Sequence, residues 1–329
     1  MHPLMEKGNE VIKYEEEFIC SSRGLKLFTC RWLPEKGKSK ALIFLCHGYA
    51  MECSVSMRET ATRLVKAGFA VYGIDYEGHG KSTGLQGYVP SFDGLVDDCL
   101  NHFMSICEKP ENQKKQRFLM GESMGGAVAL ILHRKAPVYW NGAVLVAPMC
   151  KIAEEMKPHP VVINVLSKLS KVIPTWRIIP TQDIIDVAFK NPEKRKEIRS
   201  NSLCFKGRPR LKTAHELLLV SLDIEKNLHQ ISLPFLIVHG GDDIVTDPGV
   251  SKLLYESASS EDKSFKLYPG MWHALTSAEP LESIDIVFSD IISWLNERTI
   301  IKGEIAEIEQ KSIYHKNYKD LEGYEIKGI

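Results

Sequence analysis

The sequence has no net charge, no membrane-length apolar run and no apolar segment of the kind that forms a signal peptide. Lysine plus arginine and aspartate plus glutamate number 42 each among 329 residues. This balance gives no long-range field that would attract nucleic acid or an anionic membrane, so we expect no nucleic-acid partner. No stretch is long enough for a transmembrane helix, and residues 1–10 contain no apolar h-region. We therefore expect a cytoplasmic protein whose contact with membranes, if it has any, is peripheral.

The sequence also lacks Cys-x-x-Cys motifs and Asn-x-Ser/Thr sequons. Its eight cysteines are scattered, and several lie inside apolar runs, where a thiol behaves as a small hydrophobic group. This distribution is typical of reduced thiols in the cytosol and excludes a dense disulfide framework. Apolar residues make up 44% of the chain, which is enough for a sizeable core.

Short apolar runs alternate with segments of helical periodicity through most of the chain. A run such as Ala41 to Cys46 has no polar face, which is typical of a strand buried on both sides of a parallel sheet. Strands are expected near residues 14–20, 25–32, 41–46, 69–74, 118–120, 143–147, 234–238 and 264–268. Helices are expected near residues 55–67, 91–107, 124–135, 213–222, 248–257 and 283–297. The pattern predicts an α/β fold with a mostly parallel, eight-stranded, doubly wound sheet and an antiparallel start.

The alternation stops between residues 151 and 225, where an apolar stripe with helical spacing runs from Val161 to Ile173. We interpret 151–225 as a helical lid inserted between two parts of a core, 11–150 and 226–298. The stripe either packs on the body or lines an apolar tunnel or touches a lipid surface. The candidate substrate contacts in it are Val162, Leu166, Leu169 and Trp176. The charged tail, 299–329, fits both a frayed helix and a disordered segment.

Residues 121–125 form a Gly-x-Ser-x-Gly motif between an expected strand and an expected helix. This is the pattern of a nucleophile elbow, in which a sharp turn exposes a serine, here Ser123. Strand and helix backbones approach closely at such a turn, so side chains at Gly121 and Gly125 would clash. The alternative is a serine that only caps the helix, and the remaining sequence has to decide between the two.

A serine nucleophile needs a base and an acid that orients the base. In this type of sheet they follow in the order serine, acid, histidine, each after a strand. Asp243 follows the strand near 234–238, and His273 follows the strand near 264–268. Asp242 and Asp247 compete for the acid role, but Asp247 precedes a proline and suits a helix N-cap.

Other residues at strand ends have different expected roles. His47, His79 and His239 are expected to be structural, each with its ring donating to nearby loop backbone. The oxyanion hole requires two N–H donors, one after the nucleophile and one in the loop after the third strand. These are the backbone groups of Met124 and Tyr49. This chemistry requires no metal and no cofactor.

Together these motifs resemble the monoacylglycerol lipase branch of the α/β-hydrolase family. The resemblance lies in His47-Gly48, Gly78-His79-Gly80-Lys81-Ser82, Gly121-Glu122-Ser123-Met124-Gly125-Gly126, His239-Gly240-Gly241-Asp242-Asp243 and Gly270-Met271-Trp272-His273. The stretches 47–54, 147–152 and 154–158 resemble more specifically a plant subgroup of monoacylglycerol lipases, caffeoylshikimate esterases and lysophospholipases. The resemblance implies an α/β-hydrolase fold and assigns nucleophile, acid and base to Ser123, Asp243 and His273. Animal enzymes of this branch have Gly-Glu-His shortly after His-Gly; this chain has Ala50-Met51-Glu52, so their glycerol contacts do not transfer.

The sequence therefore predicts a serine carboxylester hydrolase that forms an acyl-enzyme on a small, amphiphilic ester. The apolar stripe favours a long acyl chain, as in monoacylglycerols or lysophospholipids. The alternative substrate is a hydroxycinnamoyl ester such as caffeoylshikimate, an intermediate of phenylpropanoid and lignin metabolism. More distant alternatives are an acyltransferase and a small-molecule receptor of the same fold. Oligomeric state is not predicted.

Overall fold

The computed structural model describes residues 12–35, 39–151, 159–178 and 183–299. The 154–158 motif, residue 11 and the tail beyond residue 299 lie outside these ranges. The contacts between residues divide the chain into two compact units, of which the first ends at Phe288 and the second begins at Ser289. The sheet and every residue of the candidate site belong to the first unit.

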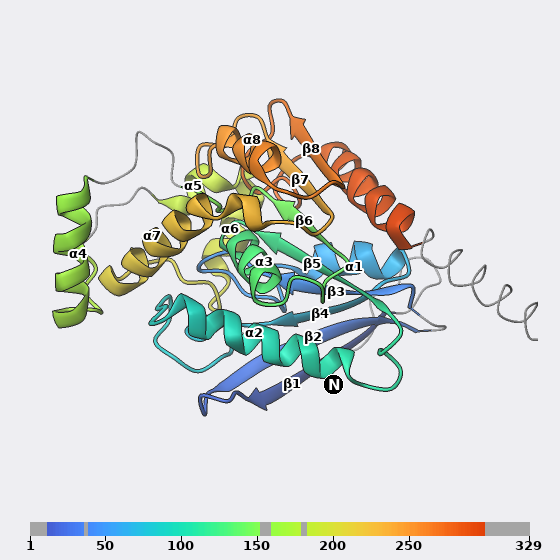
Figure 1. Ribbon diagram of the computed structural model, residues 1–329, viewed down its shortest axis with the longest axis horizontal. Helices are drawn as coiled ribbons and strands as arrows, with labels where there is room; N and C mark the ends of the chain where they lie inside the picture. The colour runs from blue at the N-terminus through green and yellow to red at the C-terminus, as the bar shows by residue number, and fades with distance from the viewer. Residues whose placement is uncertain (1–11, 36–38, 152–158, 179–182, 300–329) are drawn as a thin grey trace, which may run out of the picture. The chain divides into compact units, whose positions relative to one another are not determined.

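One eight-stranded sheet forms the centre of the first unit, in the order β1-β2-β4-β3-β5-β6-β7-β8 (Figure 1). Its strands are β1 (Ile12–Cys20), β2 (Lys26–Pro34), β3 (Ala41–Cys46), β4 (Ala70–Ile74), β5 (Gln116–Glu122), β6 (Gly142–Val146), β7 (Phe235–Gly240) and β8 (Lys263–Tyr268). β2 pairs antiparallel with β1 and with β4, and all later pairs are parallel. The predicted mostly parallel sheet with an antiparallel start is confirmed.

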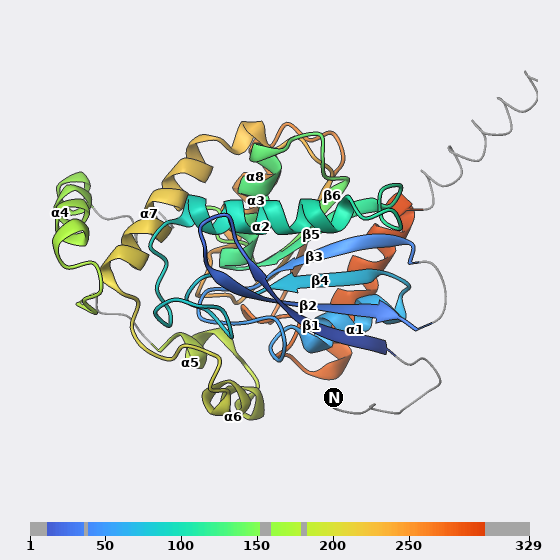
Figure 2. The ribbon, with the colours of Figure 1, turned by 90° about the horizontal axis from the view of Figure 1, so that it is seen from below.

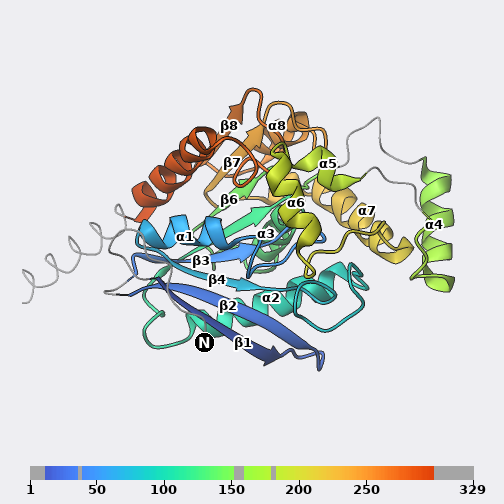
Figure 3. The ribbon, with the colours of Figure 1, turned by 180° about the vertical axis from the view of Figure 1, so that it is seen from behind.

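Helices cover both faces of the sheet, as its fully buried strands require. α1 (Arg58–Lys66) packs against β2 and β4 on one face, which Figure 3 shows in a view from behind. The opposite face, seen in Figure 1, carries α2 (Phe92–Cys107), α3 (Met124–Lys135) and α8 (Pro248–Ser257). α8 begins as expected, because the Asp247 side chain accepts from Gly249 N and Pro248 is its first residue. Residues 281–299 are also helical.

Between β6 and β7 the described chain is helical and contains no strand. The helices are α4 (Pro160–Val172), α5 (Ile184–Ala188), α6 (Pro192–Ser200) and α7 (Leu211–Lys226), followed by the short 3-10 helix η2 (Leu228–Gln230). α4 lies against α7, on the side away from the sheet (Figure 2). Neither α5 nor α6 is among the predicted helices, although Asn191 and Pro192 form a normal start for α6: the Asn191 side chain accepts from Glu193 N and Lys194 N.

Candidate active site

Ser123 lies at the turn between β5 and α3 in a conformation that non-glycine residues rarely adopt. Its φ is 54° and its ψ is −117°. Neighbouring backbone holds the turn in place: Ser123 N donates to Val146 O at 3.0 Å, and Met149 N donates to Ser123 O at 2.9 Å. Such strain persists only where the surrounding structure enforces it, and it is common at catalytic residues. A serine that merely capped the helix would accept a bond from the first helical turn, and the Ser123 side chain makes no such bond.

Glycines at the elbow permit the close approach that the turn demands. A Cβ on Gly121 would overlap the carbonyl oxygen of Gly125, and a Cβ on Gly125 would overlap that of Cys46. These atoms belong to backbone and cannot swing away as a flexible side chain could. Glycine is therefore required at both positions for steric reasons.

The structure brings Asp243 and His273 together from the loops after β7 and β8. His273 Nδ1 is 2.7 Å from Asp243 Oδ2, while Asp243 Oδ1 accepts from Val245 N at 2.7 Å and Thr246 N at 3.1 Å. Burial alone would raise the pKa of Asp243, but hydrogen bonds from His239 and His273 outweigh it and lower the pKa well below its usual range. Asp243 is therefore a fixed anion beside the His273 ring.

The loop that carries His273 is anchored on several sides. A Cβ on Gly240 would overlap the carbonyl oxygens of Met271 and Trp272, so glycine allows the acid and histidine loops to touch. Trp272 N donates to the Glu279 carboxylate at 2.6 Å. Further along, Thr276 Oγ1 donates to Glu122 Oε1 at 2.9 Å, which ties the loop to the residue before Ser123. Burial raises the pKa of Glu122.

The loop after β3 lies directly beside the elbow. A Cβ on Gly48 would come within 3.6 Å of Ser123 Cβ. The carbonyl of Gly48 is fixed by the His47 ring, with Nδ1 at 2.8 Å, and by Met51 N at 3.3 Å. Because the N–H of Tyr49 belongs to the same peptide unit, fixing this carbonyl also fixes that N–H.

The two N–H groups expected to form the oxyanion hole belong to Tyr49 and to Met124, the first residue of α3. Within the described ranges neither donates to a protein acceptor. The Tyr49 ring is held in place because its hydroxyl donates to Gly87 O at 2.9 Å and its edge meets the ring of Phe205. Backbone N–H groups near a serine can stabilise a developing oxyanion, so the predicted role of these two groups stays a prediction.

His47 and His79 support this loop from behind, in the structural role expected of them. The His47 ring stacks on Tyr76 with ring centroids 3.8 Å apart. His79 Nδ1 lies 3.1 Å from Glu77 O, and its buried Nε2 has no hydrogen-bond partner in the described structure. Burial lowers the pKa of His79 to about 4, because a charged ring would lose its hydration there.

Replacing His79 by glutamine should flatten the dependence of stability on pH. The folded pKa of His79, about 4, is below its ordinary value, so its contribution to stability is complete above about pH 6.5 and is lost as pH falls toward 4. Between pH 7 and pH 5 the wild type should lose about 2 kcal/mol more unfolding free energy than His79→Gln in urea titrations. Burial raises the pKa of Asp75 to about 7, so its effect on the pH dependence of stability has the opposite sign. This effect is the same in the wild type and in His79→Gln, and it cancels in the comparison. Equal slopes would contradict a neutral, buried His79.

Among the four predicted substrate contacts on the lid, three are solvent-exposed. The exposed fractions are 46% for Val162, 37% for Leu169 and 58% for Trp176, while Leu166 is half-buried. Leu166 shares its side of α4 with the buried Ser170. The structure thus places most of these side chains on the outer surface of α4 and the segment after it.

Other residues between 151 and 225, which were not among the predicted substrate contacts, pack on the loops of the site. Ile185, Ala188, Phe189 and Ile198 of the α5–α6 region form one apolar cluster with Met51, Val245 and Ala274. Met51 lies in the loop after β3, Val245 follows Asp243 by two residues, and Ala274 follows His273. Backbone bonds join the same parts, from Ala274 N to Ala188 O at 3.0 Å and from Phe205 N to Ala50 O at 2.9 Å. The sequence signal for this cluster was Phe189, an apolar residue just before the Asn191-Pro192 start of α6.

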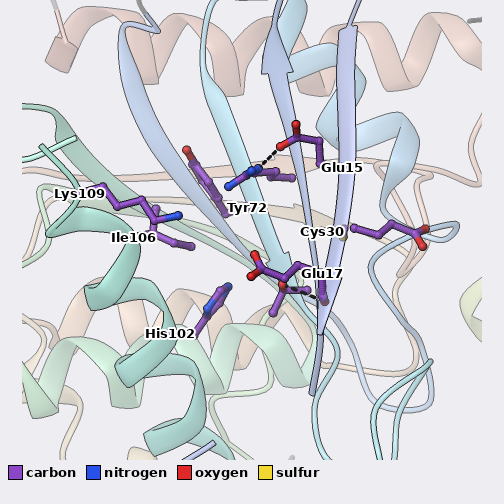
Figure 4. Close-up of a pocket in the computed structure, with 10 residues that line it drawn as sticks. Glu15, Glu17, Cys30, Tyr72, His102, Ile106 and Lys109 are labelled. Carbon is purple, nitrogen blue, oxygen red and sulfur yellow. Dashed lines mark hydrogen bonds and ion pairs between the residues drawn. The ribbon is translucent and has the colours of Figure 1, made fainter. Parts of the chain in front are cut away.

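Two further features of the structure lie apart from Ser123, Asp243 and His273. A groove of about 490 Å³ between β1, β2, β4 and α2 is lined by polar residues that include Glu17, Tyr72, His102 and Lys109 (Figure 4). His47, Cys53 and Asp75 place potential metal-ligand atoms within 4.8 Å of one another. Protein donors already occupy that cluster: Tyr76 N binds His47 Nε2, while Cys53 N and Lys81 N bind Asp75. It fits a structural network that joins two loops.

Over the ranges described, no helix is long and apolar enough to cross a membrane.

Comparison with known proteins identifies the family. The model of the family described as serine aminopeptidase, S33, matches residues 37–280. The chain belongs to this family of hydrolases. The hydrolase is 36% identical over 275 residues to caffeoylshikimate esterase of Arabidopsis thaliana, covering 83% of this chain and 82% of that one. It is 30% identical over 285 residues to monoglyceride lipase of Homo sapiens, covering 87% and 91%.

Solved structures show the same fold at lower sequence identity. A soluble variant of monoglyceride lipase from Saccharomyces cerevisiae, in complex with a substrate analog, superposes with a TM-score of 0.75 at 20% identity, covering 90% of this chain and 99% of that one. The monoacylglycerol lipase of Paleococcus ferrophilus gives 0.69 at 24% identity, covering 83% and 99%. The hydrolase thus has the α/β-hydrolase fold. Its named relatives are esterases and lipases, so it is a carboxylic ester hydrolase.

Proposed function

We propose that the hydrolase cleaves monoacyl esters of the monoacylglycerol or lysophospholipid type, with Ser123 as nucleophile, His273 as base and Asp243 as the acid that orients it. The Asp243–His273 hydrogen bond of 2.7 Å leaves Nε2 of the ring as the nitrogen available to Ser123. His273 Nε2 takes the serine proton as Oγ attacks the ester carbonyl. The ring becomes an imidazolium, which the Asp243 anion stabilises.

In the same step the carbonyl oxygen becomes an oxyanion. The N–H groups of Tyr49 and Met124 bind it, helped by the positive end of the α3 dipole. The imidazolium then protonates the leaving alcohol, and an acyl-enzyme on Ser123 remains. Water, deprotonated by His273, attacks the acyl carbonyl and releases the fatty acid. No step of this sequence calls for a metal or a cofactor.

The observation that favours a lipid substrate is the exposed apolar surface of α4. Val161, Val162, Val165, Leu169 and Val172 are all exposed, with Val172 77% exposed. Trp176 and Ile178 extend this surface beyond the helix. An apolar stripe left in water is costly unless it meets an apolar partner, and an amphiphilic substrate is presented at such an interface. We infer that residues 151–225 act as a lid whose outer helix contacts lipid peripherally and whose α5–α6 part covers the triad loops.

A hydroxycinnamoyl ester is the second candidate substrate. Its support is the 36% identity with a protein named caffeoylshikimate esterase, higher than the 30% identity with human monoglyceride lipase. A flat aromatic acyl group would need an aromatic wall close to Ser123. The ring of Tyr49, in the loop after β3, meets the ring of Phe205 and provides an aromatic surface in that region. The cytoplasmic location inferred from composition stays a prediction.

Hydrolysis of a substrate panel distinguishes the two candidates. We expect purified protein to hydrolyse monoolein or lysophosphatidylcholine at least tenfold faster, in kcat/KM, than caffeoylshikimate. A difference of this size corresponds to about 1.4 kcal/mol between the two transition states, which a few methylene contacts supply. The reverse order would make the hydroxycinnamoyl ester the substrate and leave the triad assignment untouched.

The lid can be tested in the same assay with a matched pair of substitutions. Val162→Glu places a charge on the exposed stripe of α4, whereas Val138→Glu makes the same change at a fully exposed position between α3 and β6. We expect Val162→Glu to lower hydrolysis of vesicle-bound monoolein severalfold and to leave a water-soluble short-chain ester unaffected. Val138→Glu should match the wild type on both substrates. Equal behaviour of the two variants on vesicles would exclude α4 as the lipid-contact surface.

A further inference from the structure

Two histidines, rather than one, contact the same oxygen of Asp243. His273 Nδ1 lies 2.7 Å from Oδ2, and His239 Nε2 lies 3.0 Å from the same atom. The Thr246 hydroxyl also reaches Oδ2, at 2.9 Å. His239 is the penultimate residue of β7 and is fully buried. Its predicted bond to loop backbone is present, to Thr246 O at 3.0 Å, but the contact with the carboxylate was not foreseen.

The surroundings of the His239 ring determine which nitrogen carries the proton. Nε2 faces two acceptors, Asp243 Oδ2 and Thr246 O, so Nε2 must be the donor. Nδ1 lies 2.8 Å from the hydroxyl of Ser251, a fully buried residue of α8, which donates to it in the neutral ring. The ring is therefore held at both ends, and its donor points at the carboxylate.

We propose that His239 is a positioning residue for the reaction: it fixes the orientation of the Asp243 carboxylate and limits how strongly Oδ2 attracts the His273 proton. This inference rests on the proposed role of Asp243 as the triad acid. Backbone donors hold Oδ1 of Asp243, whereas Oδ2 is shared by the Thr246 hydroxyl, His239 and His273. Removing the His239 donor leaves Oδ2 less restrained, and a small rotation of the carboxylate then carries the bonded His273 ring out of line. Each additional donor on Oδ2 also draws electron density away from the bond to His273.

A charged group from β5 also acts on the His273 ring. The buried Glu122 carboxylate interacts with His273 electrostatically and is bound by Thr276. From β7 the corresponding group is His239, while Asp242, the neighbour of Asp243, is exposed. Variants at His239 leave Glu122 and its bond unchanged, so a shift in the pH profile can be assigned to the Asp243 side of the ring.

The test compares His239→Leu, which has no donor, with His239→Gln, whose amide nitrogen can reach the carboxylate as Nε2 does. For His239→Leu we expect kcat on a soluble ester to fall about tenfold, with KM within twofold of wild type. The acid limb of the kcat/KM profile should move up by roughly half a pH unit, because a carboxylate with fewer donors stabilises the imidazolium more. His239→Gln should restore most of both. Ser251→Ala, which removes only the bond to Nδ1, should change both in the same direction but by less.

Two controls separate this inference from stability and from the triad assignment. His133→Leu removes another fully buried histidine, bonded to Ser232 N at 3.1 Å, and should lower stability while leaving the pH profile unchanged. Asp243→Asn should be nearly inactive; if it is active, the triad assignment itself fails. If Asp243→Asn is inactive while His239→Leu keeps the wild-type kcat and profile, the role of His239 is refuted. If His239→Leu does not fold, two other results would refute the role of His239. One is wild-type behaviour of Ser251→Ala. The other is loss of activity in His239→Gln without a shift of the acid limb.

Discussion

Ser123→Ala should abolish both ester hydrolysis and covalent labelling by a fluorophosphonate probe. Without Oγ no acyl-enzyme can form, and losses on the order of a million-fold in kcat are typical when the nucleophile of a serine triad is removed. A small residual rate over water should persist, because the Tyr49 and Met124 N–H groups still bind the oxyanion. The fold should be retained, since Ser123 makes its observed bonds through backbone atoms that alanine also has.

The control for this prediction is a second serine that is accessible and whose hydroxyl is bonded to a backbone carbonyl. Ser105, on α2, donates its hydroxyl to His102 O at 2.7 Å and is exposed. Ser105→Ala should label and hydrolyse like the wild type. Labelling that survives in Ser123→Ala would mean that another residue is the nucleophile, and the elbow would then be structural only.

Asp243→Asn should reduce kcat by about ten thousand-fold while the protein stays folded. The amide offers a donor where the His273 Nδ1 proton needs an acceptor, so the ring is held in the wrong tautomer and loses its stabilised imidazolium. The same amide would also face the donors of His239 and Thr246, so some loss of stability should accompany the loss of rate. Steady-state kinetics and urea unfolding measure the two effects separately.

Asp242→Asn is the matched comparison because it changes the same chemistry one position away. Asp242 is exposed, and its backbone N–H, which asparagine keeps, is what donates to Met271 O at 3.0 Å. Its rate should stay within about twofold of wild type. If Asp242→Asn were the damaging change instead, the acid of the triad would be misassigned by one residue.

Most strands and helices could be predicted because local sequence determined them. β3, buried on both faces, appears as an uninterrupted apolar run, and its observed bounds equal the predicted ones. α8 begins where Asp247 and Pro248 require it to begin. α6 was missed although Asn191 and Pro192 form a regular start, because only one of its nine residues is buried and no apolar periodicity marks it.

Residues 151–225 show where local pattern stops being informative about function. The apolar stripe near 161–173 correctly predicted a helix, but a stripe states only that one side of a helix avoids water. The structure leaves most of that stripe in solvent and instead packs Ile185, Ala188, Phe189 and Ile198 on the loops of the site. The partner of an apolar face is chosen by tertiary packing, which residues far apart in sequence decide together.

The sequence by itself determined the family and the sheet, and it predicted Ser123, Asp243 and His273 at strand ends, because steric and hydrogen-bonding demands at a strand end restrict the residue types allowed there. Only the tertiary structure decided what surrounds the acid. His239 and Asp243 are four residues apart, but the His239 ring meets the carboxylate because Ser251 on α8 and the turn at Thr246 hold both side chains in place. Such a contact depends on the relative positions of three elements, and no local pattern encodes it.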